Sequence, residues 1–455
     1  LPTFEKLLKD GQLIETHIRS GDVTEEKAWR QISPWVVWPS VYTGMPADKH
    51  KIIGFRQKTE VLVGQCIWDK LNEKQITTGV FGSLMSYPVR HNPYNLFYFP
   101  DALAETNDCY PRSYKPIQEF FGFIARHYSK PAGVWTALRG LWKLLRGIIK
   151  GIPFSTAYEI LAQVPREYSR GTPFYRYRAL IQAKLQMDIF QLLLQRYQPS
   201  FATLHLNHIA YMQHRYWRAA EPESYQDKMG ELDLHYYGDI ETRKDYEWAF
   251  KDAILESFLL TDQFLEDLLK NIKDKNTLLV IATGLGQKKM DPASEIHNPE
   301  IRFIHLDRLL RLIDISNCEI LTPMNPEITL NFPDAAEASL AAYKLSNLKV
   351  MGEYPLFQVK QLEHQLFLDG RIPPEIWFLD SQAWLEDQAT EHILPLFDYV
   401  QLSRVKDQST AHHQEQGWLL LYGNSEPMKI SADKLDVTDI RDLLLSYFKV
   451  DSVKN

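Results

Sequence analysis

The sequence predicts an α/β fold with a largely parallel sheet, and three consecutive segments carry that prediction. Residues 278–282, LLVIA, form a continuous apolar run followed at once by a Gly-x-Gly turn, which is typical of a buried parallel strand. Residues 242–272 show apolar side chains at helical spacing, and residues 200–212 before them have β character. Strand, long helix and strand together make a βαβ unit, whose two strands run parallel.

Bulk composition limits the class of protein. The chain has 455 residues, of which 45% are hydrophobic and 24% charged, and this is ordinary for a globular protein with a large core. Its formal net charge of −7 gives no indication of a general nucleic-acid-binding surface. No apolar run reaches the roughly 18 residues of a membrane span. We find no internal repeat and no Gly/Ser linker, so residues 1–455 are predicted to form a single domain with a helical insertion or cap at 114–200.

The cysteines indicate a reducing compartment. Cys66, Cys109 and Cys318 are odd in number and far apart, which fits neither a disulfide framework nor a zinc motif. A cytoplasmic location is the simpler expectation. The chain opens on Leu1 rather than Met, so we expect the natural start to lie upstream.

The first hundred residues are predicted to alternate between helices and strands. LPTFEKLLKDG at 1–11 reads as a short helix ended by glycine, and WVVWPSVYTGMP at 35–46 as a β-rich run ending in a turn. Residues 59–75 read as a strand or turn entering a helix. Residues 76–89 read as a strand whose carboxyl end carries Ser83 and Ser86.

The block at 114–200 changes to helical patterns. Within it, VWTALRGLWKLLRGIIKG at 134–151 combines Trp and Leu with Arg139, Lys143, Arg146 and Lys150. One interpretation is a helix that lies on a membrane surface or binds an anionic ligand, so peripheral membrane contact through 135–150 is one expectation. The other is a half-buried cap helix whose basic residues are simply solvated.

Beyond residue 315 the pattern mixes strands and helices. Segments 318–332, 356–368, 397–406 and 417–423 read as strands, whereas 334–347 and 434–449 read as helices.

Histidines and two serines are the candidate chemical groups. The histidines fall into three clusters, which are His205, His208 and His214, then His305, then His412 and His413. Imidazole is a common ligand for transition metals, but carboxylates are scarce near these clusters. Ser33 and Ser40 are the candidate nucleophilic hydroxyls, although Ser33 before Pro34 also suits a turn or helix cap. The glycine-rich nucleotide-binding motifs and His-Glu-x-x-His are absent from the sequence.

A series of segments resembles the alkaline phosphatase superfamily, in its type I phosphodiesterase and nucleotide pyrophosphatase branch. SPWVVWPSVYTGMPADKHKI at 33–52 resembles the family stretch in which a Thr or Ser nucleophile precedes Thr-Gly-x-x-Pro-x-x-His-Gly-Ile, with Lys51 replacing the glycine. CIWDKL, YFPDALAE, HRYW, TLLVIATGLGQ and AHHQEQGWLLLYG follow in the family's order. The resemblance implies a three-layer α/β/α fold with a mostly parallel central sheet. It also implies hydrolysis of phosphate or sulfate esters with two divalent metals, often zinc.

Transferred residue by residue, few of the family's site groups remain. The nucleophile falls at Ser33 or Pro34, and one family histidine falls at His214 while its partner aspartate position holds Ala210. The late histidine is His412 or His413. The Asp-His of the family's strand end corresponds to Gly284 and Leu285. An early aspartate is expected on a first strand upstream of Leu1.

Two interpretations follow from the loss of carboxylates, because dications need anionic ligands. In the first, the protein is a hydrolase-like enzyme of altered or lost two-metal activity. Ser33 is then the nucleophile, His208 the general base, and His214 and His413 the residues that would hold a divalent metal such as zinc. In the second, it is a non-catalytic binding or scaffold relative whose pocket holds an anionic group. A small-molecule phosphate or sulfate ester is the expected partner in the first case.

Overall fold

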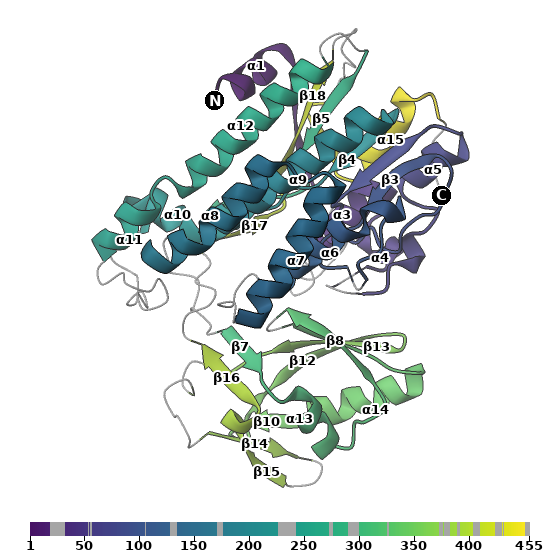
Figure 1. The fold of residues 1–455 in the computed structure, drawn as a ribbon. Helices are drawn as coiled ribbons and strands as arrows, with labels where there is room; N and C mark the ends of the chain where they lie inside the picture. The colour runs from purple at the N-terminus through teal and green to yellow at the C-terminus, as the bar shows by residue number, and fades with distance from the viewer. Residues whose placement is uncertain are drawn as a thin grey trace.

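A computed structural model describes the chain except for residues 19–31, 53, 55–56, 105, 128–133, 171–175, 226–242, 273–275, 290–299, 325–326, 373–375, 377–382, 389–391, 404–409, 424–429, 431 and 451–455. Helices and strands are intermixed along the chain and the sheets include a parallel one, so the predicted α/β class is confirmed (Figure 1). Among the described residues, no helix is long and apolar enough to cross a membrane.

The amino-terminal part contradicts the prediction at residues 35–46 and contains strands that were not predicted. Its elements are α1 (Pro2–Asp10), β1 (Gln12–His17), α3 (Pro34–Thr43), α4 (Ala47–His50), η1 (Glu60–Leu62), α5 (Ile67–Glu73), β2 (Thr78–Phe81), β3 (Asn95–Phe99) and η2 (Arg112–Tyr114). The run at 35–46, predicted as β-rich, is helix α3. Ser33 is its N-cap, Pro34 occupies the first turn and Gly44 ends it at a φ of 65°. Tertiary burial of its valines outweighs their preference for strands.

β2, β3 and β4 (Phe201–Leu204) pair parallel in a three-stranded sheet, in the order β3-β2-β4. Alternate residues along β2 and β3 face opposite ways. Phe81, Phe97 and Phe99 pack with helices of the 114–200 block, whereas Val80 and Tyr98 pack in a core that includes side chains of α3, α5 and α15 (Asp439–Tyr447). These two helical layers enclose the sheet, which gives the expected α/β/α arrangement.

The block at 114–200 consists of helices in the described residues. They are α6 (Lys115–His127), α7 (Val134–Lys150), α8 (Phe154–Arg170) and α9 (Arg176–Tyr197). Side chains of all four helices contribute to the core against β2 and β3, so the block forms one layer of the sandwich.

The predicted βαβ unit divides between two sheets. α10 (His208–Ala220), η4 (Pro222–Tyr225), α11 (Arg243–Phe250) and α12 (Ala253–Ile272) follow β4, and the long helix predicted at 242–272 is thus two helices. β5 (Leu278–Ala282) then joins the order β19-β1-β18-β5, where it pairs antiparallel to β18 (Gly417–Gly423). β19 (Lys434–Asp436) completes this second sheet. β6 (Gly286–Lys289) pairs with β17 (Ala411–Gln414).

Residues 300–403 have a hydrophobic core of their own. Its buried members all fall between Ile301 and Val400, and none comes from the two sheets described above. The elements are β7 (Glu300–Phe303), α13 (Leu306–Leu312), β8 (Glu319–Met324), β9 (Glu327–Asn331), α14 (Ala335–Ser346), β10 (Leu348–Val350), β11 (Tyr354–Pro355), β12 (Phe357–Leu362), β13 (Gln365–Gly370), β14 (Trp384–Asp387), β15 (His392–Pro395), η8 (Leu396–Asp398) and β16 (Val400–Ser403). The sequence analysis placed them in the single unit 1–455 and did not predict this separate core.

Candidate functional site

The carboxyl edge of the parallel sheet brings three chain segments together. Ser83, Asp101 and His205 follow closely on the ends of β2, β3 and β4. The N–H of Gly82 donates to the carbonyl of Phe99 at 2.8 Å, and the N–H of His205 donates to that of Phe81 at 3.0 Å. Ligands bind at such edges in open α/β sheets, so this is where a site is expected.

Asp101 holds a loop at this edge. Its carboxylate accepts the N–H of Met85 at 3.2 Å and the N–H of Leu103 at 2.9 Å. The side chain is buried, and these bonds use both of its oxygens to fix the chain after β2 and β3.

Trp38 of α3 covers the end of β5. Gly284 has a φ of 64°, and a Cβ at that position would lie 3.2 Å from Cζ2 of Trp38. The indole also meets His205 edge-on, with ring centroids 4.8 Å apart. Leu285 is buried in the adjoining core. The strand end where the family carries Asp-His is therefore packed with apolar groups.

His205 lies in a setting that favours its neutral form. Burial lowers the pKa of its imidazole to about 4. Its Nε2 is buried and has no hydrogen-bond partner among the described residues.

His214 and His413 are in direct contact, as the prediction of a shared site requires. Their Nε2 atoms are 3.3 Å apart, and the rings meet edge-on at 89°. The Nδ1 of His214 donates to the carbonyl of Ala411 at 2.7 Å, which leaves its Nε2 as the acceptor when the ring is neutral. Burial, followed by the neighbouring charge of His214, lowers the pKa of His413 to about 3. Their role as metal ligands stays a prediction.

The first turn of α10 carries the position where the family has an aspartate. Ala210 stands there, and the Nε2 of Gln287 on β6 donates to its carbonyl at 3.3 Å. Gln287 thus links β6 to the backbone of α10 at this position.

His208 faces helix α12. Its Nε2 lies 2.9 Å from the Thr261 hydroxyl and 3.3 Å from the carbonyl of Ser257. Burial lowers the pKa of His208 to about 4. None of the contacts in the described part of the chain joins His208 to Ser33.

Ser33 begins helix α3. Its carbonyl accepts the N–H groups of Val36 and Val37, both at 3.0 Å, while its side chain makes no capping hydrogen bond. The hydroxyl is half-buried at the positive end of the helix, a position that favours anions.

Ser40 and His50 form a buried pair that the sequence analysis did not predict. Ser40 Oγ and His50 Nε2 are 2.9 Å apart, and His50 Nδ1 accepts the N–H of Ile52 at 3.0 Å. Because Nδ1 is an acceptor, Nε2 carries the proton and donates to Ser40. Burial lowers the pKa of His50 to about 4. His50 therefore holds the turn after α3 and does not activate Ser40 as a base.

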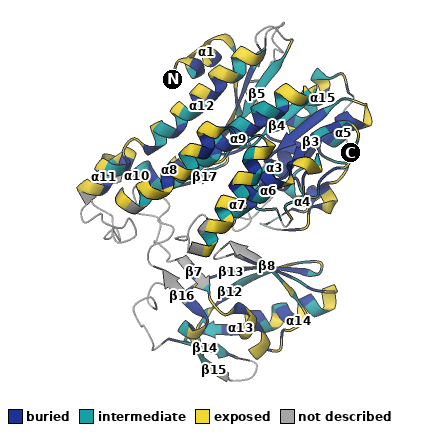
Figure 2. Ribbon diagram, viewed as in Figure 1, coloured by how far each residue is buried: buried dark blue, intermediate teal, exposed yellow. Residues whose placement is uncertain are grey.

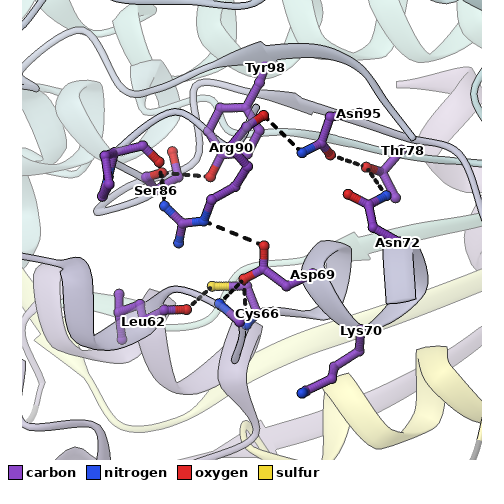
Figure 3. A network of polar contacts seen from close by, with 12 residues as sticks. Leu62, Cys66, Asp69, Lys70, Asn72, Thr78, Ser86, Arg90, Asn95 and Tyr98 are labelled. Carbon is purple, nitrogen blue, oxygen red and sulfur yellow. Dashed lines mark hydrogen bonds and ion pairs between the residues drawn. The ribbon is translucent and has the colours of Figure 1, made fainter. Parts of the chain in front are cut away.

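A polar network lies between α5 and the loop after β2 (Figure 3). Asp69 accepts the N–H groups of Gly64 at 2.9 Å and Cys66 at 3.2 Å, and its other oxygen lies 3.4 Å from Arg90 Nε. Burial raises the pKa of Asp69 even though Arg90 opposes that effect. Burial also raises the pKa of the Cys66 thiol, so the thiol stays protonated.

The same network continues to the far end of β2 and β3. The hydroxyl of Tyr98 donates to the carbonyl of Ser86 at 2.6 Å, and Asn95 Nδ2 donates to the carbonyl of Arg90 at 3.1 Å. Asn95 also accepts from Thr78, which accepts from Asn72 at 3.0 Å. The network is buried and its contacts link α5 to both β2 and β3, which indicates that it supports the sheet.

Comparison with known proteins identifies the family of the chain. Residues 33–316, more than half of the sequence, match the sequence model of the type I phosphodiesterase / nucleotide pyrophosphatase family. No curated protein matches the sequence significantly.

Among solved structures, human ectonucleotide pyrophosphatase / phosphodiesterase 5 matches with a TM-score of 0.41 and 11% identity, over 100% of this chain and 91% of that one. The murine protein matches with a TM-score of 0.38 and 11% identity at the same coverage. An inactive variant of the murine protein in complex with AMP gives 0.38 and 10%, again over 100% and 91% of the two chains.

The family match covers the segment from the N-cap of α3 to the residues after α13. It therefore includes His214 and the carboxyl ends of β2, β3, β4 and β5. The chain therefore belongs to the type I phosphodiesterase / nucleotide pyrophosphatase family of the alkaline phosphatase superfamily.

Proposed function

We propose that this protein is a phosphodiesterase-like relative in which the two-metal ester hydrolysis of its family is altered or lost. The observation that carries the proposal is the indole of Trp38 against Gly284. Any carboxylate side chain at position 284 needs a Cβ, and that atom would lie 3.2 Å from the ring and crowd it. The protein keeps the family's fold and one histidine pair. At the strand end where the family has Asp-His, it has Gly284 and Leu285, which pack against apolar groups.

The histidine pair fits part of a metal site. Two imidazole ligands of a tetrahedral zinc ion, each with a Zn–N distance of about 2.0–2.1 Å, have nitrogens about 3.3 Å apart. The Nε2 atoms of His214 and His413 are 3.3 Å apart. However, the described residues contain no group of three or more His, Cys, Asp or Glu side chains that could hold a metal ion. The residues present therefore do not fit a two-metal cluster.

Ser33 is the candidate nucleophile if hydrolysis persists. Its hydroxyl at the amino terminus of α3 is where a phosphate or sulfate group would be favoured by the helix dipole. His208 was the predicted base, but its Nε2 faces Thr261 and Ser257 of α12. Because no described contact links the two residues, the Ser33–His208 reaction stays a prediction.

The second candidate function is non-catalytic binding of an anionic group. It is favoured by Ala210 and Gly284, which stand where the family has carboxylates. Without those carboxylates the region carries less negative charge, so a phosphate or sulfate group would meet less repulsion there.

Turnover assays test the proposal. We expect no hydrolysis of p-nitrophenyl phosphate, bis(p-nitrophenyl) phosphate or p-nitrophenyl sulfate above the level of a His214→Ala/His413→Ala variant, with or without added zinc. His305→Ala, at an exposed histidine outside the site, is the matched control. Turnover that disappears in the double variant would show a working metal site. Turnover that needs Ser33 but neither histidine would instead support the metal-free reaction.

A further inference from the structure

Helices α7 and α8 present an apolar stripe on their outer side. Trp135, Trp142 and Ile149 of α7 are 79%, 63% and 79% exposed, and Phe154 at the start of α8 is 79% exposed. With Leu138 and Leu145, the α7 residues are spaced three or four apart, so they share one face of the helix. Figure 2 shows exposed residues along both helices.

The opposite face of α7 fixes this orientation. Leu144 is buried in the core against the parallel sheet. A Cβ on Gly140 would lie 2.8 Å from the ring of Phe123 on α6, so the two helices pack closely there. One face of α7 therefore packs against the sheet core and α6, whereas the outer stripe is exposed and available for binding a partner.

A basic stripe runs beside the apolar one. It consists of Arg139, Lys143, Arg146 and Lys150, again three or four residues apart, and 134–150 contains no acidic residue. Lys143 and Arg146 lie 3.6 and 3.0 Å from the carboxylate of Glu119, whereas Arg139 and Lys150 are exposed. This concentration of positive charge contrasts with the chain's net charge of −7.

We propose that α7 and the start of α8 form a docking surface for an anionic lipid bilayer. Tryptophan suits the boundary between headgroups and acyl chains, because its ring is apolar and its N–H is polar. Exposed arginine and lysine beside it would meet the negative headgroups. A protein partner would need a groove of matching shape with acidic walls, whereas a bilayer accepts a protruding helix without shape complementarity. The inference is independent of the function proposed for the histidine pair.

Co-sedimentation with lipid vesicles tests the proposal on the full chain. We expect binding to mixed phosphatidylcholine–phosphatidylglycerol vesicles, weak binding to pure phosphatidylcholine, and loss of binding at high salt. Arg139→Gln/Lys150→Gln should weaken binding roughly 25-fold, since each basic residue near an anionic surface contributes about fivefold. Trp142→Ser/Ile149→Ser should also abolish most of the binding. Trp248→Ser, at a 77% exposed tryptophan of α11, is the matched control and should bind like the unmodified protein.

Several results would overturn the proposal. One is equal binding to both kinds of vesicle, and another is no binding to either. Binding that both double variants retain would place the contact elsewhere. A concentration-dependent dimer that Trp142→Ser/Ile149→Ser dissociates, in a protein that ignores vesicles, would show that the face is a protein interface. Because all five substituted residues are exposed, circular dichroism should show every variant folded.

Discussion

At the scale of single residues, Trp38 and Gly284 decide how the candidate site is interpreted. The indole lies against a glycine whose φ of 64° and close neighbour both disfavour a side chain. Even a Cβ at position 284 would require the indole to shift by a few tenths of an ångström, and that ring also packs on His205 and Tyr42.

Gly284→Ala should therefore destabilise the protein more than a glycine substitution of the same backbone type. Gly64 also has a positive φ, of 79°, but a Cβ there meets nothing within 4 Å. Gly64→Ala should cost about 1 kcal/mol for the left-handed backbone alone. Gly284→Ala should cost about 1–3 kcal/mol more, because the methyl group crowds the indole. If urea denaturation gave the same loss of unfolding free energy for both variants, Trp38 would not restrict position 284.

The buried histidines predict a loss of stability in acid. The pKa of His208 is lowered to about 4 in the folded protein, whereas an unfolded histidine has a pKa of about 6.5. Between these values the unfolded chain binds more protons, so stability falls as pH falls from about 6.5 to about 4. Each such imidazole contributes a slope of up to about 1.4 kcal/mol per pH unit.

Unfolding free energies of His208→Gln between pH 4 and 7 provide the measurement. The slope of the unfolding free energy against pH should decrease in His208→Gln by up to the contribution of one imidazole. His305→Gln, at an exposed residue, should not change that slope. An unchanged slope in His208→Gln would mean that His208 is protonated equally in both states.

Sequence reasoning located some of these residues and missed others. His214 and His413 were paired through the family resemblance, and the structure brings their Nε2 atoms within 3.3 Å. His50 falls on the histidine of the family's Thr-Gly-x-x-Pro-x-x-His-Gly-Ile stretch, but its contact with Ser40 depends on how α3 and α4 meet. The contact of Trp38 with Gly284 joins residues 246 positions apart, and local patterns carry no information about such a contact.

At the scale of elements, the polar network between α5 and the loop after β2 has the clearest energetic consequence. The Asp69–Arg90 pair is buried on both sides, with 10% and 7% of the two side chains exposed. Removing one partner of such a pair leaves the other charged and unpaired, which is costly.

Asp69→Ala should lower the free energy of unfolding by about 3–5 kcal/mol, because Arg90 and two N–H groups lose their acceptor. Glu73→Ala breaks the partly exposed Lys70–Glu73 pair on the same helix, and it should cost less than about 1 kcal/mol. Chemical denaturation compares the two. Similar losses would mean that Arg90 finds another partner or water when Asp69 is absent.

Helix α3 shows where prediction of elements fails. Its valines, tryptophans and tyrosine favour strands locally, yet Ser33, Pro34 and Gly44 supply a helix start and stop. The helical block at 114–200 was easier to predict because its periodicity and its packing agree.

At the scale of the whole molecule, the family assignment implies two-metal ester hydrolysis, whereas the residues of the candidate site support a different activity or none. The match over residues 33–316 shows the family, whereas the indole against Gly284 and the alanine at position 210 support the proposal that its two-metal chemistry is altered or lost. The separate core of residues 300–403 could not be predicted, because strand patterns alone do not tell which strands share a core.

Metal content per chain tests the central claim most directly. The protein should be purified without chelator, dialysed against zinc and then metal-free buffer, and measured by elemental analysis. We predict fewer than two zinc ions per chain, and less zinc still in His214→Ala/His413→Ala. Two tightly held zinc ions per chain, lost in that variant, would contradict the claim that the two-metal site is altered or lost.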